Sequence, residues 1–374
     1  GTVALTLDID LQAAAEESLE RTITGMMDTD SRQRGGAAVV MGVKSGEVLA
    51  LATYPTYDPT TFNRDYESLS TDDRLPLFNR ATDGVYAPGS TFKLCTAVAA
   101  LESGIITPTT TIRDQGVYTY YAYPQPKCWI YRQYGSTHGS INVSQAITES
   151  CNYFFYETGR LTGIETIDNY ATQFGLGRST GIETGDSKGA LASPEYAKAN
   201  ELEWTDGQTI TAAIGQSYNL FTPIQLANYV ATLVGDGEHY KAHLLKNVKS
   251  YDNSSMIYAY DEGPENTVSI SGSTLQAVKE GMYGVANSTL SSQFSRCIVT
   301  CGAKTGSAQV GTDIANGTFV CFAPYDDPQI AVAVVIEKGG SGAALAGVAV
   351  DIVNAYFSRE EIGTAIIGEN TLIS

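Results

Sequence analysis

The stretch that decides the fold is Tyr86-Ala87-Pro88-Gly89-Ser90-Thr91-Phe92-Lys93. Lys93 is the only lysine of the chain with a serine three positions before it. If Pro88-Gly89 ends an irregular segment and a helix begins near Ser90, residues i and i+3 share one helix face, so the lysine reaches the serine hydroxyl. Unpaired N–H groups at such a helix start also stabilise an oxyanion. The spacing therefore predicts an activated serine nucleophile.

A run of apolar residues after Lys93 supports this helix. They recur at helical spacing and form one stripe: Leu94, Ala97, Val98 and Leu101. Gly104 supplies a C-terminal stop. We therefore expect a helix that begins near Ser90 and is anchored in a core.

Two further motifs follow the first in order. Ser150-Cys151-Asn152 is an S-x-N run, and Lys304-Thr305-Gly306-Ser307 is a K-T-G-S run. Each has an ordinary reading, since S-x-N also caps helices and K-T-G-S also ends a strand before a turn. S-x-x-K alone is expected roughly once by chance in a chain of this length. The three motifs together, in this order, are typical of acyl-serine chemistry.

On these motifs the chain resembles the penicillin-binding proteins, more narrowly the class B transpeptidases that cross-link peptidoglycan, and within them the elongation-type penicillin-binding protein 2 group. Further stretches are similar to the family in order and kind: residues 36–40, 44–50, 79–81, 214–216 and 222–227. The resemblance implies an α/β (α+β) fold of the penicillin-binding transpeptidase and serine β-lactamase-like type. Such a fold has a central antiparallel sheet flanked by helices and an all-helical subdomain.

Hydrophobic periodicity predicts one sheet built from both ends of the chain, with a helical insert between them. The expected strands are residues 37–43, 47–53, 303–309, 318–323 and 330–336, with Asn316-Gly317 and residues 326–328 as turns. The expected helices are residues 8–29, segments near 142–150, 152–162, 165–174, 207–214 and 223–234, and residues 343–357.

We expect two parts along the chain. Residues 1–35 would be an N-terminal helix and linker from a truncated pedestal region, and residues 36–374 the transpeptidase domain. Within that domain, the sheet subdomain would comprise about 36–89 and 265–374, and the helical subdomain about 90–264. The active site would lie at their junction.

A serine hydroxyl is too weak an acid to attack an amide at neutral pH, so Ser90 needs a base. Lys93 is the candidate, and it must be partly neutral although a free lysine has a pKa of about 10.4. Burial and a second cation, Lys304, both favour the neutral form. The resemblance implies that Ser150 relays protons between Lys93 and the leaving amine, and that Asn152 holds the substrate amide.

The resemblance also implies the substrate, a peptidoglycan stem peptide ending in D-Ala-D-Ala. Its terminal carboxylate would bind at Thr305, Gly306 and Ser307, with Lys304 adding positive potential. The backbone N–H groups of Ser90 and Ser307 would form the oxyanion hole. A β-lactam would mimic the substrate and trap Ser90. A serine β-lactamase and a penicillin-sensing receptor domain remain alternatives, although both are usually shorter than this chain.

A candidate zinc site combines four residues: Asp114, Cys128, His138 and Cys151. Their residue types suit zinc, although their spacing matches no compact zinc-finger pattern. Residues 137–143 resemble elongation-type members that carry a structural metal beside the S-x-N loop. The alternatives are a buried free Cys151, a surface His138, and a Cys128 packed beside Trp129. No cofactor is expected for the chemistry itself.

The remaining cysteines and histidines receive no chemical role. Cys95 and Cys321 are expected in the core. Cys297 and Cys301 lie four residues apart, too far to bond if they belong to a strand that leads to Lys304. His239 and His243 are expected on a solvated surface.

Net charge and apolar content limit which partners and which location we expect for the chain. The 374 residues carry a net charge of −18, from 41 acidic against 23 basic residues, which argues against nucleic acid or anionic lipid as a partner. No stretch of 18 or more apolar residues is present. Class B members have an N-terminal membrane anchor, so we expect this chain, which starts at Gly1, to be a trimmed part that faces outward from the bacterial cell membrane. The missing segment would contact a membrane glycosyltransferase.

Overall fold

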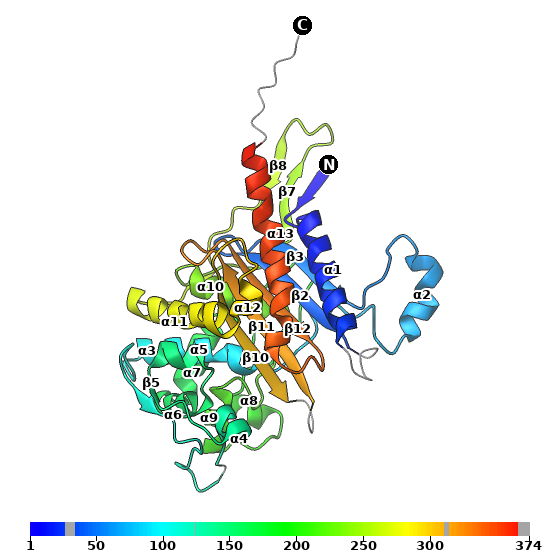
Figure 1. Cartoon of the computed structure of the whole chain (residues 1–374). Helices are drawn as coiled ribbons and strands as arrows, with labels where there is room; N and C mark the ends of the chain where they lie inside the picture. The colour runs from blue at the N-terminus through cyan, green and yellow to red at the C-terminus, as the bar shows by residue number, and fades with distance from the viewer. Residues whose placement is uncertain (27–33, 124, 310–313, 366–374) are drawn as a thin grey trace.

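The computed structural model describes residues 1–26, 34–123, 125–309 and 314–365. Its central element is a five-stranded antiparallel sheet in the order β10-β11-β12-β2-β3 (Figure 1). The strands are β2 (Gly36–Gly42), β3 (Val48–Tyr54), β10 (Gly302–Gln309), β11 (Ala315–Ala323) and β12 (Ile330–Ile336). Val332 of β12 lies opposite Val40 of β2. The sheet is therefore assembled from both ends of the chain, as the periodicity predicts.

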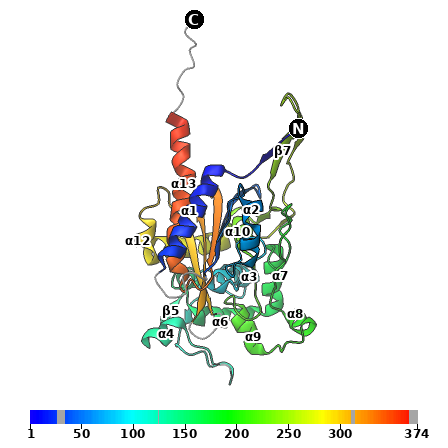
Figure 2. The same cartoon turned by 90° about the vertical axis from the view of Figure 1, so that its right-hand side faces the viewer.

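Both faces of the sheet are covered because its central strand is apolar on both sides. Ala331, Ala333 and Val335 of β12 enter one core, and the alternate residues Ile330, Val332, Val334 and Ile336 enter a second. An all-apolar strand of this kind is stable only between two layers. Helices α1 (Ile9–Gly25) and α13 (Ala346–Ala365) pack on one face, and α10 (Pro223–Val234) and α11 (Gly272–Gly284) on the other (Figure 2).

A helical region lies below the sheet in Figure 1. Its helices are α3 (Lys93–Glu102), α4 (Trp129–Tyr134), α5 (Val143–Thr148), α6 (Asn152–Thr162), α7 (Ile164–Gln173), α8 (Pro194–Ala199) and α9 (Asp206–Ala212). Residues 93–101 of α3 are all buried, so this helix is the centre of the region. The helices expected at 152–162 and 223–234 match α6 and α10 residue for residue.

Smaller elements complete the fold. A second sheet, β1 (Thr2–Leu5), β7 (Leu245–Lys249) and β8 (Met256–Ala259), stands beside the N-terminus. The others are α2 (Phe62–Thr71), β4 (Ile112–Arg113), β5 (Ser140–Ile141), β6 (Glu238–His239), β9 (Asn266–Thr267) and α12 (Ser291–Phe294), with short turns of helix at Gly89–Phe92, Val285–Thr289 and Gly342–Leu345. None of the helices in the described part of the chain has the length and apolarity needed to cross a bilayer.

Two sequence expectations need correction. Helix α1 ends at Gly25 rather than at residue 29, and residues 27–29 lie outside the described ranges. Asn316 and Gly317 do not form a turn, because they pair with Ala308 and Ser307 inside the β10–β11 ladder. Pairing with a neighbouring strand therefore overrides the local turn signal of Asn-Gly.

Candidate active site

Ser90 lies on a short turn of 3-10 helix, Gly89–Phe92, that leads directly into α3. This turn is pressed against the loop around Gly215. The N–H of Gly89 donates to the Gly215 carbonyl at 2.9 Å, and a Cβ built on Gly215 would lie 2.1 Å from the carbonyl oxygen of Gly89. Only glycine at position 215, where φ is +75°, allows this approach. The expected nucleophile is thus held by backbone packing.

Strand β10 brings the K-T-G-S residues against the same turn. A Cβ on Gly306 would meet the carbonyl oxygen of Pro88 at 2.5 Å, so the two backbones nearly touch. Because β10 is the edge strand of the central sheet, its outer edge is not paired with another strand of that sheet. Thr305, Gly306 and Ser307 therefore lie across from Ser90, at the edge of the helical region.

Lys93 and Lys304 meet at Ser150. The Lys93 ammonium donates to Asn152 Oδ1 at 2.6 Å, to the Ser150 carbonyl at 2.8 Å and to Ser150 Oγ at 3.3 Å. Lys304 Nζ lies 3.0 Å from the same Oγ. Within the described residues, no hydrogen bond joins Lys93 Nζ to Ser90 Oγ. Side chains from all three motifs therefore converge, with Ser150 between the two lysines.

Burial shifts both lysines toward the neutral amine. Neither residue has exposed surface. Burial lowers the pKa of Lys93 to about 8. The pKa of Lys304 falls well below its ordinary value because of burial and, secondarily, because of the nearby Lys93 charge. A lysine amine that is partly neutral near pH 8 is able to accept a proton from a hydroxyl.

Ser150 is held in an uncommon backbone conformation. Its φ is +52°, in the left-handed region, which costs a non-glycine residue roughly 1–3 kcal/mol. Helix α5 ends just before it, and α6 begins at Asn152 just after it. The turn between two buried helices thus aims Ser150 and Asn152 at Lys93.

The three motifs line one cavity of about 760 Å³. Ser90, Ser150, Asn152, Thr305, Gly306 and Ser307 are all on its wall. Sequence reasoning missed several other lining residues: Trp129, Arg132 and Gln133 of α4, and Val285, Thr289 and Leu290 beside β10. No motif marks them. The fold of α4 over the S-x-N turn, with Trp129 Nε1 donating to the Glu149 carbonyl at 3.0 Å, places the first three here. The other three are placed by the turn of helix that follows α11 and contacts β10.

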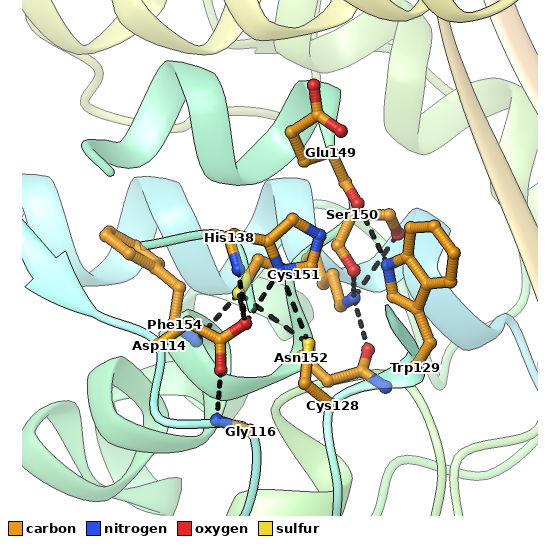
Figure 3. A network of polar contacts seen from close by, with 11 residues as sticks. Asp114, Gly116, Cys128, Trp129, His138, Glu149, Ser150, Cys151, Asn152 and Phe154 are labelled. Atoms are coloured by element: carbon orange, nitrogen blue, oxygen red, sulfur yellow. Dashed lines mark hydrogen bonds and ion pairs between the residues drawn. The ribbon is translucent and has the colours of Figure 1, made fainter. Parts of the chain in front are cut away.

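The four candidate metal ligands are brought together next to this cavity (Figure 3). One ligand atom from each of Asp114, Cys128, His138 and Cys151 lies within 4.8 Å of all the others. The two Sγ atoms are 3.8 Å apart, and His138 Nδ1 is 2.8 Å from Asp114 Oδ2. The pKa of the Cys128 thiol is lowered, chiefly because the Cys151 thiol donates to it. Cys151 itself stands between Ser150 and Asn152, so this cluster supports the S-x-N turn.

Of the expectations for the other cysteines, one is confirmed and one is wrong. Cys95 and Cys321 are fully buried in the two cores, as predicted. Cys297 and Cys301 are both free, and their Sγ atoms lie 3.8 Å apart. They precede β10 in an irregular turn, so the expectation that a strand would hold them apart was wrong.

The two remaining histidines are buried rather than solvated. His243 is 3% exposed, bonds the carbonyls of Leu245 and Ser45, and stacks on Tyr260. His239 is 6% exposed, and its Nδ1 lies 2.9 Å from Thr232 Oγ1. The sequence expectation was wrong because the fold buries both rings, and polar groups near them accept or donate hydrogen bonds in place of water.

Residues 36–357 match the family described as the penicillin binding protein transpeptidase domain. The chain belongs to this family. Among curated relatives, the peptidoglycan D,D-transpeptidase MrdA of Escherichia coli (strain K12) is 34% identical over 370 residues, which cover 92% of this chain and 56% of that protein. MrdA of Haemophilus influenzae is 32% identical over 391 residues, covering 96% of this chain and 57% of that protein. The chain thus spans little more than half the length of these relatives.

Solved structures agree with this membership. Penicillin-binding protein PBP2 of Pseudomonas aeruginosa, in complex with WCK 5153, superposes with a TM-score of 0.81 at 30% identity, covering 95% of this chain and 78% of that one. PBP2 of Helicobacter pylori, in complex with MreC, gives a TM-score of 0.79 at 27% identity, covering 97% and 64%. These similarities confirm the expected fold class and the resemblance of the chain to the elongation-type group.

Proposed function

We propose that the chain is the catalytic part of a peptidoglycan D,D-transpeptidase, an acyl-transfer enzyme that works through Ser90. The observation that carries this proposal is the convergence of Ser90, Lys93, Ser150 and Lys304 around one cavity in a member of the penicillin-binding family. The relatives named D,D-transpeptidase support the same reaction.

In the acylation step, neutral Lys93 takes the proton of Ser90 Oγ, which attacks the carbonyl carbon of the penultimate D-alanine. Asn152 holds the substrate amide. Ser150 Oγ, within 3.3 Å of both lysine nitrogens, passes a proton to the leaving nitrogen and regains one from Lys93. The C–N bond breaks, D-alanine departs, and an ester on Ser90 remains.

The substrate is oriented by the edge of β10. Thr305, Gly306 and Ser307 bind the terminal carboxylate, with Lys304 behind them. The N–H groups of Ser90 and Ser307 stabilise the oxyanion. In the second step an amine of another stem peptide attacks the ester carbon, an amide bond forms, the C–Oγ bond breaks, and the proton lost by the nitrogen returns to Ser90.

The assignment extends to location and partners. We place the chain on the outer side of the bacterial cell membrane, held by an N-terminal transmembrane segment of the longer protein. Support comes from the longer relatives and from the complex of Helicobacter pylori PBP2 with MreC. A solved peptidoglycan synthase complex that coordinates polymerization and crosslinking supports a glycosyltransferase partner.

The test is intact mass after incubation with benzylpenicillin, comparing the native chain with Ser90→Ala. We expect one persistent adduct on the native chain and none on the variant. An adduct that disappears while hydrolysed drug accumulates would indicate a serine β-lactamase. Absence of any adduct on the native chain would refute the assignment of Ser90.

The cluster of Asp114, Cys128, His138 and Cys151 fits a structural zinc ion. Two thiols, an imidazole and a carboxylate are ordinary zinc ligands, and two thiolates on a tetrahedral zinc lie about 3.8 Å apart. The Cys128 and Cys151 Sγ atoms are 3.8 Å apart. When bound, zinc would supply no reaction chemistry and would tie the loops of Asp114, Cys128 and His138 to the S-x-N turn.

Metal removal tests this zinc assignment. We expect about one zinc per chain by elemental analysis, and a lower melting temperature after treatment with a strong chelator, because metal binding stabilises the folded state. Cys128→Ser should lose the zinc, and Cys297→Ser, a thiol outside the cluster, should retain it. A chain purified with added zinc that contains none would show that the cluster is only packed.

A further inference from the structure

Two cysteines outside the candidate metal cluster lie close together just before β10. The Sγ atoms of Cys297 and Cys301 are 3.8 Å apart, and the Cys301 thiol donates a hydrogen bond to Cys297. Both are free thiols in this structure. Cys297 follows α12, and Cys301 immediately precedes Gly302, the first residue of β10. The pair therefore spans the connection between α12 and the strand that carries the K-T-G-S residues.

The surrounding fold holds this connection on both sides. Asn354 of α13 brackets Cys297, because its Nδ2 donates to the Arg296 carbonyl at 2.9 Å and its Oδ1 accepts from the Ile298 N–H at 3.0 Å. On the other side of the pair, the ladder between β10 and β11 begins at Gly302. Contacts with α13 and with the central sheet therefore keep the two thiols near each other.

Two neighbouring thiols suit either a metal ion or a disulfide. Among the described residues, one group of three or more candidate metal ligands is found, the group around Asp114, and neither Cys297 nor Cys301 belongs to it. A structural zinc ion needs four ligands, so two thiols alone do not make such a site. A disulfide needs only the two sulfurs, which would move from 3.8 Å to about 2.05 Å apart.

The two thiols differ in access and acidity, and this difference sets the order in which they react. Cys297 is half-buried, whereas Cys301 is only 1% exposed. The pKa of the Cys297 thiol is lowered, chiefly by the hydrogen bond from Cys301 and also by the charge of Arg296. Because the thiolate is the form that attacks a disulfide, Cys297 is the sulfur that reacts first with an oxidant in solution.

We propose that Cys297 and Cys301 are a modification site, a pair that is oxidised to a disulfide by a low-molecular-weight disulfide. Cys297 loses its proton, its thiolate attacks one sulfur of the oxidant, and the S–S bond of the oxidant breaks. The Cys301 sulfur then gives up its proton and attacks the Cys297 sulfur, which releases the second half of the oxidant. Two S–H bonds of the protein are replaced by one S–S bond, and the oxidant takes up two electrons and two protons to become two thiols.

The bond would join the segment after α12 to the start of β10, three residues before Lys304. Disulfides persist outside the bacterial cytoplasm, which agrees with the proposed location of the chain. Neither cysteine is among the described residues that line the catalytic cavity. Closure of the bond should therefore stabilise the attachment of β10 and leave acylation of Ser90 unchanged. The site goes beyond the transpeptidase function and does not depend on that reaction.

The test exposes the native chain, in buffer that contains zinc, to glutathione disulfide. Remaining thiols are blocked with iodoacetamide after denaturation, and tryptic peptides are identified by mass. Cleavage after Arg296 and Lys304 releases residues 297–304, which contain both cysteines of the pair, whereas Cys321 falls in residues 305–338. We expect the 297–304 peptide to be lighter than its reduced form by two hydrogen atoms and to carry no alkyl group. After reduced glutathione it should carry two.

Three results would overturn the site. Two alkyl groups on the 297–304 peptide after treatment with the oxidant would show that the thiols do not bond. A glutathione adduct on Cys297 with an alkylated Cys301 would show that the second step is blocked. A link between the 297–304 and 305–338 peptides would make Cys321 the partner instead. A native chain that forms the disulfide but no penicillin adduct would refute the role of Ser90 and leave this site standing.

Thermal stability gives a second readout. Closing a ring over residues 297–301 should raise the melting temperature of the oxidised native chain by roughly 2–3 °C above that of the reduced chain. The difference should vanish in Cys297→Ser and persist in Cys321→Ser, a control thiol in the same core. Each variant is compared with its own reduced form, so that packing changes cancel. Equal melting temperatures of the two native forms would overturn the stabilising role of the bond.

Discussion

The protonation state of Lys93 controls whether Ser90 can be activated. Burial lowers the pKa of this lysine to about 8, and only the neutral amine above that pKa accepts a proton. The rate of benzylpenicillin acylation should therefore rise with pH and level off above a midpoint near 8. Lys93→Arg should remove acylation, because a guanidinium stays protonated. Stopped-flow rates across this pH range test the expectation, with Lys44→Arg on the surface as control, and a flat profile would contradict it.

Glu337 holds two buried partners near the start of the Ser90 segment. Its Oε1 accepts from Arg80 Nε at 2.9 Å and from the Tyr86 hydroxyl at 2.8 Å, and the Arg80 side chain is only 5% exposed. Glu337→Gln leaves this guanidinium buried without a counter-charge, which should lower the free energy of unfolding by about 3 kcal/mol. Urea denaturation measures the change. Asp72→Asn, which breaks the exposed pair with Arg74, should have little effect.

Residue types, their order and the family resemblance predicted the site residues, and the structure gathers side chains of all three motifs in one place. The catalytic roles of these residues stay predictions. Residues without a motif were not predictable. Arg132 and Glu149 reach the cavity only because α4 and the S-x-N turn fold together. For His243, the sequence predicted a solvated side chain. The structure instead buries it, and its ring nitrogens bond the carbonyls of Ser45 and Leu245.

At the scale of elements, the backbone of the loop around Gly215 packs closely against the turn of helix that carries Ser90. A Cβ on Gly215 would lie 2.1 Å from Gly89 O, so Gly215→Ala must move the turn. Gly104 follows α3 with φ +71° and nothing within 4 Å of its Cβ position. Gly104→Ala should cost about 1–2 kcal/mol of stability from strain alone and leave acylation unchanged. Gly215→Ala should in addition slow penicillin acylation by roughly tenfold or more.

Equal acylation rates in the two variants would show that the packing of Gly215 on Gly89 does not position the nucleophile. The measurement is the same adduct assay, made below the melting temperature of each variant. Glycine at both positions has positive φ, so the comparison separates strain from steric approach.

Helices and strands with a clear apolar pattern were predictable from sequence. Strands that depend on pairing with a strand distant in sequence were not. Helices α6 and α10 and strand β12 match the expected ranges because caps and apolar patterns mark their ends. The β1-β7-β8 sheet was missed because β8 is exposed along its length and has no buried face to set a period. Strand β11 begins earlier than expected because its partner strand extends over Asn316 and Gly317.

For the whole molecule, the division proposed at residue 35 remains a prediction that truncation tests. Helix α1 buries Leu11, Leu19 and Ile23 completely in the core shared with α13 and the sheet. Full burial of three such side chains contributes roughly 5–9 kcal/mol, comparable to the total stability of an ordinary domain. A chain that begins at Gly36 should therefore lose its cooperative thermal transition and its penicillin adduct.

Removal of residues 1–4 is the matched control, because it deletes only part of the β1 edge, whose residues there are mostly exposed. That shorter deletion should lower the melting temperature slightly and retain the adduct. If the chain from Gly36 instead melts at the same temperature as the full chain, α1 is dispensable and residue 35 is a true domain boundary. If it unfolds, α1 is part of the catalytic fold, because α13 and the central sheet cannot cover their shared core without it.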